Sequence, residues 1–232
     1  MSAAIGVLEQ SEVEADRLLE KAGLYRFFSR LFAAPPPLEL IQDIAEHDLL
    51  TTACHFHQTA GRFQRLEDGR WASMAEEIAV EFTRLFSAPG THYLPPYESF
   101  YVDDLHIEGA EDAGCGVAFQ EGVWKGFIGQ QSASQLGALY AAAGLEINPA
   151  FHDLPDHFAA ELEFLAYLAT CQASALQQGH SELAARYACQ AEQFRRGHLD
   201  RWGPAFLARV QANPISRFYC QVAVGLEGFL RQ

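Results

Sequence analysis

The sequence predicts an all-α protein, a single domain of 232 residues built from two helical parts. Apolar residues recur at intervals of three and four along most of the chain, which is the period of a helix with one buried face. One stretch departs from this pattern, because residues 109–129 are rich in glycine and carry no helical period. We therefore expect an N-terminal helical part at about 1–108 and a C-terminal part at about 130–232, joined by a hinge loop at about 109–129.

Three helices are predicted before residue 90. Ser11 and Glu14 have the spacing of a capping box, and the helix that follows should end at the proline run 35–37. A second helix is expected from about Leu38 to Leu50, and a third from about Trp71 to Phe86, because apolar residues recur there with a helical period.

The glycine-rich stretch has two interpretations. Its alternating aromatic and β-branched residues are also typical of a β-hairpin. Isolated two-stranded ribbons are only marginally stable in water, so we favour a linker without strands.

The C-terminal part contains the remaining predicted helices. Helical pattern resumes near Ser132 and ends at Gly144, a residue type that suits a helix C-terminus. The next helix should start close to Pro155 and end near Leu176. Three further helix starts are expected at Ser181, Pro204 and Pro214.

Composition and charge exclude several functional classes. The chain has 30 Asp and Glu against 16 Lys and Arg, a net charge of −14, so its surface repels nucleic acid and anionic lipid. The N-terminus lacks the basic and apolar regions of a secretion signal, and no apolar run approaches the roughly 18 residues of a membrane span. The five cysteines form no CxxC pair, which is typical of reduced thiols. We expect a cytoplasmic protein with no nucleic-acid partner and no stable membrane insertion.

The stretch LPDHFAAELEFLAYL (154–168) places charged residues on an otherwise apolar helix. His157 and Glu161 lie four residues apart on one face, so they could chelate a metal or form an acid–base pair. The plainer interpretation is a helix cap by Asp153 or Asp156, together with a hydrogen bond between the histidine and a carboxylate.

Phe158, Leu162 and Leu165 share the other face of this helix and are predicted to lie in the core. Metal-dependent enzymes built as helical bundles use Glu-x-x-His pairs, and no histidine here follows a glutamate by three residues. Phosphate-binding loops and the G-x-S-x-G motif are also missing from the sequence. An enzyme that binds a metal through His157 and Glu161 is the alternative function.

A second unusual stretch is THYLPPYESFYVDD (91–104), in which two prolines stiffen a segment rich in aromatic residues. Rigid aromatic rings beside acidic residues suit the recognition of a peptide, because they provide contact area at low entropic cost. The alternative is an ordered loop whose rings fill the core. The aromatic residues of this stretch are Tyr93, Tyr97, Phe100 and Tyr101.

Four segments together resemble the TorD/DmsD group of cytoplasmic molybdoenzyme chaperones, which are relatives of the nitrate reductase assembly chaperones. Their order and spacing in an acidic helical chain make the match specific. The segments are EFTRLFSAPG running into LPPYESFYV (81–102), PDHFAAELEFLAYL (155–168), FRRGHLDRW with its trailing FL (194–207), and RFYCQVAVGLEGFL (217–230).

The resemblance implies an all-helical fold with two subdomains and a hinge, and a role without catalysis. Such chaperones bind the twin-arginine signal peptide of a molybdoenzyme precursor, hold the apoenzyme for insertion of the molybdopterin cofactor, and prevent premature export. The family's client groove corresponds to Asp156 and His157 and to the loop residues Pro96, Glu98 and Ser99. One departure is Pro155, which directly precedes Asp156, whereas family members commonly place this proline one position earlier.

A twin-arginine peptide offers two guanidinium groups followed by an apolar segment. Its receptor needs carboxylates for charge-assisted contacts and an apolar groove beside them. We expect Glu161 to orient His157 and the charged end of this helix to face the groove. The carboxylates are expected from Glu98, Asp156 and Glu161, and the apolar wall from Tyr97, Phe100, Tyr101 and Phe164.

Several properties are left open by the sequence. It does not identify the client enzyme, and it permits a structural assembly subunit as a further alternative. No resident cofactor or metal is expected, and direct transient binding of molybdopterin cofactor or guanine nucleotide is undecided. The glycine-rich hinge also permits a homodimer formed by domain swapping.

Overall fold

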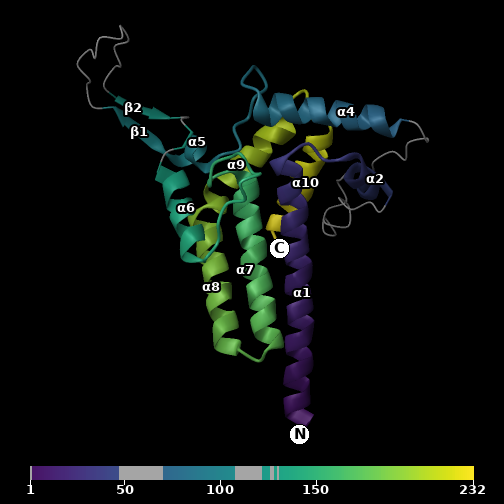
Figure 1. Cartoon of the computed structure of the whole chain (residues 1–232), viewed down its shortest axis with the longest axis vertical. Coiled ribbons are helices and arrows are strands. Elements are labelled where there is room, and N and C mark those ends of the chain that lie inside the picture. Colours follow the sequence, from purple (N-terminus) through teal and green to yellow (C-terminus); the bar gives the residue numbers. More distant parts are fainter. Residues whose placement is uncertain (1, 47–69, 108–121, 126–127, 130) are drawn as a thin grey trace.

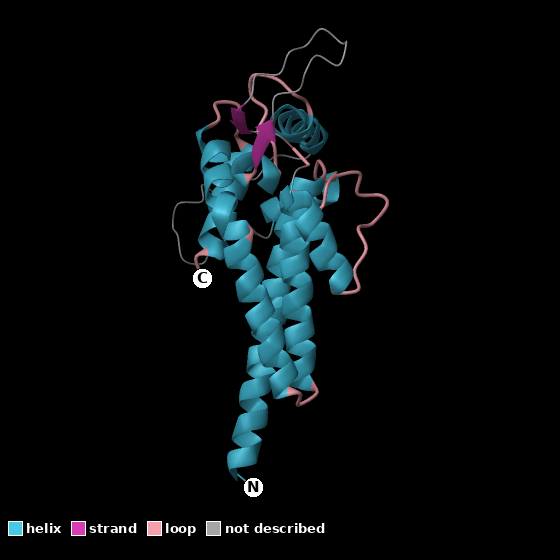
Figure 2. Cartoon of the chain, turned by 90° about the vertical axis from the view of Figure 1, so that its left-hand side faces the viewer, coloured by secondary structure: helices cyan, strands magenta, loops and turns pink. Residues whose placement is uncertain are grey.

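Three long helices run alongside one another and set the length of the molecule (Figure 1). They are α1 (Ser2–Ala33), α7 (Phe158–Gln177) and α8 (Ser181–Gly197), and α7 lies between the other two and contacts both. The end of α1 that carries the N-terminus extends past the α7–α8 turn (Figure 2). This computed structural model describes residues 2–46, 70–107, 122–125, 128, 129 and 131–232.

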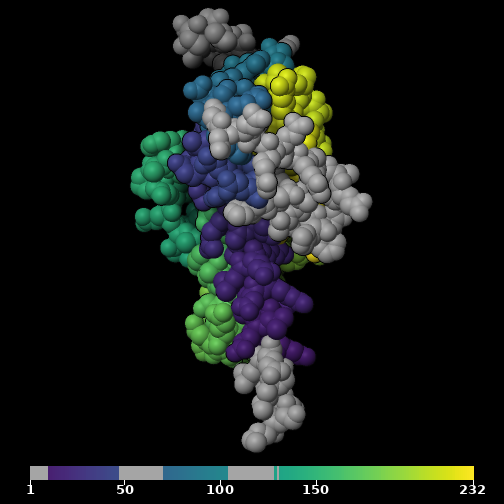
Figure 3. Space-filling view, turned by 90° about the vertical axis from the view of Figure 1, so that its right-hand side faces the viewer, coloured from purple at the N-terminus to yellow at the C-terminus, as the bar shows by residue number. Residues whose placement is uncertain are grey.

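Shorter helices gather at the opposite end of the bundle, where α4 crosses over its top (Figure 1). Figure 3 shows the face on which α1, α2 and α4 follow one another along the long axis. No helix of the described residues is both long and apolar enough to cross a membrane. The shorter helices are α2 (Leu38–Glu46), α4 (Trp71–Phe82) with its π-helical continuation η1 (Thr83–Ser87), α5 (Glu98–Val102), α6 (Gln131–Ala142), α9 (Leu199–Ala212) and α10 (Phe218–Leu230).

A short antiparallel ribbon projects beside α5 (Figure 1). Strand β1 (Asp104–Ile107) pairs with β2 (Gly122–Lys125). The preference for a linker without strands was therefore wrong at 122–125. The partner strand lies before the glycine-rich stretch, and β2 also contacts α5, which gives the ribbon support that an isolated hairpin lacks. Most of the hinge expected at 109–129 lies outside the described residues. Apart from this ribbon the described secondary structure is helical, so the all-α prediction is confirmed.

One hydrophobic core runs through both parts of the chain. The ring of Phe32 in α1 packs edge-on against Phe158 in α7, with centroids 5.0 Å apart. It also packs against Phe206 in α9 at 5.7 Å and Tyr219 in α10 at 5.9 Å. Edge-to-face pairs of this kind stabilise a core beyond the area they bury. The N-terminal and C-terminal parts thus share a single core.

Helix ends follow local chemistry where glycine is present. Gly144 has a φ of 74°, a left-handed conformation that costs glycine little. Its N–H donates to the carbonyl of Ala141 at 2.9 Å, and the N–H of Leu145 donates to Tyr140 at 2.9 Å. This is a Schellman ending for α6, and it confirms the predicted C-terminus. Helix α8 begins at Ser181 as predicted.

Three predicted helix starts were wrong. Helix α1 already begins at Ser2, so Ser11 lies inside it. Pro204 lies within α9 rather than at its start. Pro204 and Asp200 are both exposed, so water can solvate the carbonyl that the proline leaves without an N–H partner. Pro214 lies in a turn closed by the bond from Ser216 N–H to the Asn213 carbonyl, and α10 starts only at Phe218.

The start of α10 is capped by a side chain from another helix. The carboxylate of Glu81 in α4 accepts hydrogen bonds from the N–H groups of Arg217 at 2.9 Å, Phe218 at 3.2 Å and Tyr219 at 2.9 Å. An anion at a helix N-terminus satisfies unpaired donors and complements the helix dipole. Glu81 therefore joins α4 to the C-terminal helix.

We predict that Glu81→Ala lowers the free energy of unfolding by about 2 kcal/mol, because three donors, two of them partly buried, lose their acceptor. Urea denaturation followed by circular dichroism measures the loss. Glu76→Ala, an exposed position on the same helix, is the control and should change stability by less than about 0.5 kcal/mol. Equal effects of the two changes would contradict the capping role.

Candidate functional site

The two stretches singled out in the sequence meet in the structure. Residues 96–98 run antiparallel to residues 156–158, and the N–H of Phe158 donates to the carbonyl of Pro96 at 2.8 Å. In return the N–H of Glu98 donates to the carbonyl of Asp156 at 2.9 Å. This pairing, which we call the polar junction, joins the start of α5 to the start of α7.

Asp156 caps α5 rather than its own helix. Its Oδ2 accepts from the N–H of Ser99 in the first turn of α5, at 2.9 Å. The hydroxyl of Ser99 in turn accepts from the N–H of Gly129 at 3.0 Å. Burial raises the pKa of the Asp156 carboxyl, and the hydrogen bonds from Ser99 oppose this shift. The prediction that Asp153 or Asp156 caps α7 was therefore wrong, and Asp153 instead accepts from the hydroxyl of Tyr97.

His157 is the residue that caps α7. Its Nδ1 accepts from the N–H of Ala159 at 3.1 Å, which requires the neutral ring with its proton on Nε2. The ring packs edge-on between Tyr97 at 5.2 Å and Phe151 at 5.3 Å. Burial lowers the pKa of His157 to about 4, so the imidazole is uncharged near neutral pH.

Glu161 is fully buried one turn further along α7. Its Oε1 accepts from the indole N–H of Trp202 at 3.0 Å, and its other oxygen has no hydrogen-bond partner. Burial and the nearby Glu98 raise the pKa of this carboxyl well above its usual range. This shift favours the neutral acid. Glu161 bonds Trp202 and does not orient His157 as the sequence suggested.

Glu98 ties the junction to the break between α8 and α9. Its carboxylate lies 2.8 Å from Nδ1 of His198 and 3.4 Å from Nη1 of Arg201. Because Glu98 is completely buried, these two basic groups replace the water that a carboxylate otherwise needs. Sequence reasoning missed His198, Arg201 and Trp202 as partners, although all three lie in the 194–202 segment that carried the resemblance.

The remaining predicted residues support the same junction. Pro155 lies in the turn before α7 and not inside the helix, which starts at Phe158. Its carbonyl accepts a hydrogen bond from the hydroxyl of Tyr140 at 3.1 Å. The ring centroids of Tyr101 and Trp202 lie 5.3 Å apart. The guanidinium of Arg209 lies 5.6 Å from the centroid of the Tyr101 ring. Burial raises the pKa of Tyr101 to about 12.

The charged end of α7 does not open into a groove. Asp156 and Glu161 are 0% exposed and His157 is 3% exposed. Backbone hydrogen bonds hold the paired loop at 96–98 against the start of the helix, and Glu161 contacts Trp202 of α9. The structure therefore differs from the expected groove mouth, and these side chains form a buried polar layer instead.

An open pocket lies beside this layer, between α1, α7 and the segment 145–151. Its volume is about 450 Å³, within the range typical of ligand pockets, and most of its lining is apolar. Phe151, which packs on His157, and Ala159, in the first turn of α7, belong to both the pocket and the junction. The lining residues are Arg26, Ser29, Ala33, Tyr140, Leu145, Glu146, Ile147, Asn148, Phe151, Ala159, Ala160, Glu163, Phe164 and Tyr167.

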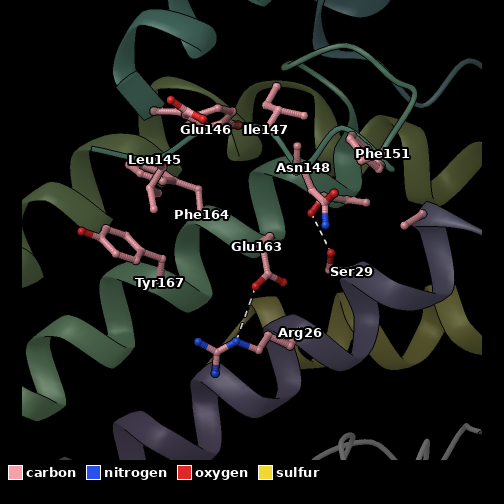
Figure 4. A pocket seen from close by; sticks show the side chains of 14 residues that line it. Arg26, Ser29, Leu145, Glu146, Ile147, Asn148, Phe151, Glu163, Phe164 and Tyr167 are labelled. Atoms are coloured by element: carbon pink, nitrogen blue, oxygen red, sulfur yellow. Dashed lines mark hydrogen bonds and ion pairs between the residues drawn. The ribbon is translucent and has the colours of Figure 1, made fainter. Parts of the chain in front are cut away.

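Polar groups mark the edge of this pocket (Figure 4). Arg26 Nε lies 3.5 Å from Oε1 of Glu163, and their side chains are 44% and 55% exposed. The hydroxyl of Ser29 donates to the carbonyl of Ala159 at 2.8 Å. No sequence motif points to Arg26 or Ser29, because α1 joins the site through its packing on α7.

The described residues contain no group of three or more His, Cys, Asp or Glu side chains placed to hold a metal ion. The two residues of the alternative metal site are engaged elsewhere, since His157 Nδ1 caps α7 and Glu161 accepts from Trp202. The chemistry that the site offers is binding by shape, apolar contact and surface charge.

Comparison with known proteins identifies the class of this chain. The family model of the nitrate reductase delta subunit matches residues 47–208. The chain therefore belongs to this family, and the predicted membership of the TorD group, which consists of chaperones rather than enzymes, is confirmed.

Its relatives carry the name chaperone protein TorD. The protein from Vibrio cholerae El Tor is 28% identical over 165 residues, which cover 71% of this chain and 61% of that protein. A second Vibrio cholerae protein, from the classical Ogawa strain, is 30% identical over 146 residues and is covered over 54% of its length. The protein from Vibrio parahaemolyticus is 23% identical over 224 residues, 91% of this chain and 92% of that protein. No solved structure matches the chain significantly.

We predict that His157 makes folding sensitive to acid. The unfolded chain binds a proton below a pKa of about 6.5, whereas the folded chain does so only near a pKa of about 4. Stability contributed by neutral His157 is therefore lost as the pH falls through this window. Between pH 7 and pH 5 the wild type should lose about 2 kcal/mol more than His157→Asn, which keeps a capping oxygen but does not titrate. Urea denaturation at both pH values tests this, and parallel losses would contradict it.

Glu161 should have the opposite effect. Its raised pKa means that the folded protein holds a proton that the unfolded chain releases above about pH 4.3, so stability falls as the pH rises. Glu161→Gln keeps an acceptor for Trp202 and needs no proton. We expect it to be more stable than the wild type at pH 7, and to lose this advantage at pH 4. A less stable Glu161→Gln protein at pH 7 would show that the carboxylate is charged in the fold.

Proposed function

We propose that this protein is a cytoplasmic chaperone that binds the precursor of a molybdopterin-dependent oxidoreductase through its twin-arginine signal peptide. The observation that carries the proposal is the apolar pocket with exposed carboxylates at its edge, in a chain of the TorD group. The protein acts by reversible binding. It holds the apoenzyme while the cofactor is inserted and keeps the precursor from export until then.

The pocket matches the chemistry of such a peptide. The apolar segment of the signal packs against rings that line the pocket, such as Phe151, Phe164 and Tyr167. The preceding arginines meet Glu146 and Glu163, two exposed acids of the lining, because guanidinium groups bind carboxylates through paired hydrogen bonds. The net charge of −14 attracts a basic peptide from a distance and speeds its encounter with the site.

The polar junction serves as the rigid back of this binding site. Asp156 and Ser99 fix the loop at 96–101 to α7, and His157 supports Phe151 in the pocket wall. A preformed wall lowers the entropic cost of binding a flexible peptide. In this proposal the predicted client-binding residues act through the shape of the pocket, and Glu163 supplies a direct charge contact.

Calorimetric titration with a synthetic signal peptide tests the proposal. We expect saturable binding that weakens about tenfold when both arginines of the peptide are replaced by alanine, since each lost charge-assisted contact is exposed and partly screened. Glu163→Gln should weaken binding of the arginine peptide about threefold to tenfold.

The matched control is Glu182→Gln, which removes the same charge from an exposed position at the start of α8, outside the pocket. It should leave the affinity within about twofold of the wild type. Equal binding of the arginine and alanine peptides would contradict a twin-arginine receptor. In cells, the chaperone should co-purify with the immature client and be absent from the mature enzyme.

A further inference from the structure

Arg26 lies at the edge of the pocket, beside the carboxylate that an arginine of a bound peptide would also contact. It lies on α1, and its guanidinium points toward Glu163 of α7 (Figure 4). Nε lies 3.5 Å from Oε1 of Glu163, and Nη2 donates to the hydroxyl of Thr170 at 2.9 Å. Glu163 and Thr170 together thus already form a receptor that accepts a guanidinium group.

The charges around the pocket make this contact distinctive. Among the described lining residues, Arg26 is the one cation, and Glu146 and Glu163 are the acids. The side chains of Arg26 and Glu163 are both about half exposed. A half-exposed pair joined at 3.5 Å through a single nitrogen contributes little to stability and is screened by salt. Arg26 can therefore leave Glu163 at small cost.

We propose that Arg26 is an internal competitor that occupies the arginine site of the empty chaperone and is displaced by an arginine of the client signal. This inference rests on the proposed function and adds a residue that sets its specificity. A client arginine that forms two hydrogen bonds to Glu163 replaces the weaker contact and gains energy from the exchange. A peptide without arginine gains nothing at Glu163, because Arg26 still neutralises this carboxylate.

Two substitutions of Arg26 test the exchange by calorimetry with the synthetic twin-arginine peptide. Arg26→Gln removes the charge, and Arg26→Met removes it while keeping most of the apolar stem that lines the pocket. Both should tighten binding of the arginine peptide about twofold to fivefold, because the competing contact is gone. Neither should change the weak binding of the peptide in which alanine replaces both arginines.

A matched control removes general charge effects. Arg30→Gln deletes the same charge from an exposed residue one turn further along α1, outside the pocket lining. It should change affinity less than about 1.5-fold at 0.15 M salt. In a Glu163→Gln background, Arg26→Gln should no longer tighten binding, because the contested carboxylate is absent.

The outcomes separate this inference from the proposed function. If the wild type binds the arginine peptide but Arg26→Gln and Arg26→Met leave its affinity unchanged or weaken it, the competitor role is wrong while the receptor stands. If Arg30→Gln tightens binding as much as Arg26→Gln does, the effect is one of net charge and the inference is also overturned. If the wild type does not bind the signal peptide at all, the proposed function fails, and the competitor role fails with it.

Discussion

The backbone pairing of residues 96–98 with residues 156–158 is the constraint on which the site depends. Two hydrogen bonds fix its register, from Phe158 to Pro96 and from Glu98 to Asp156. Because side chains alternate along paired extended segments, a slip of one residue would turn His157 away from its neighbours and expose Phe158. The side-chain contacts of Asp156 with α5 and of His157 with its two aromatic neighbours follow from this register.

Burial of acids in an already acidic protein is tolerated here because each buried carboxyl is neutralised or hydrogen-bonded. Glu98 has two basic neighbours, Asp156 accepts from the backbone, and Glu161 accepts from the indole of Trp202. The charges that remain in solvent are therefore the ones available to a partner. Glu163 is one of them, and it lies two residues from Glu161 on a face of α7 that points away from the core.

The helical class, the ends at Gly144 and Ser181, and the core face of α7 could be predicted from the sequence, because each depends on residues close together in the chain. Phe158 and Leu162 are fully buried, as the helical period indicated. The burial of Glu161 could not be predicted, since it depends on Trp202 in a different helix. The pocket could not be predicted from the sequence either, because α1 and the segment 145–151 come together only in the folded chain.

The shared core also determines the order in which the chain can fold during synthesis. The bond from Ser29 in α1 to Ala159 in α7 joins residues 130 positions apart. Until α7 leaves the ribosome, the apolar side of α1 that contains Phe28 and Phe32 lacks the helix with which α1 makes most of its contacts. Such distant contacts slow folding, because a long loop must close before the contacts form. A long helix of this chaperone therefore lacks its main partner while the chain is being made.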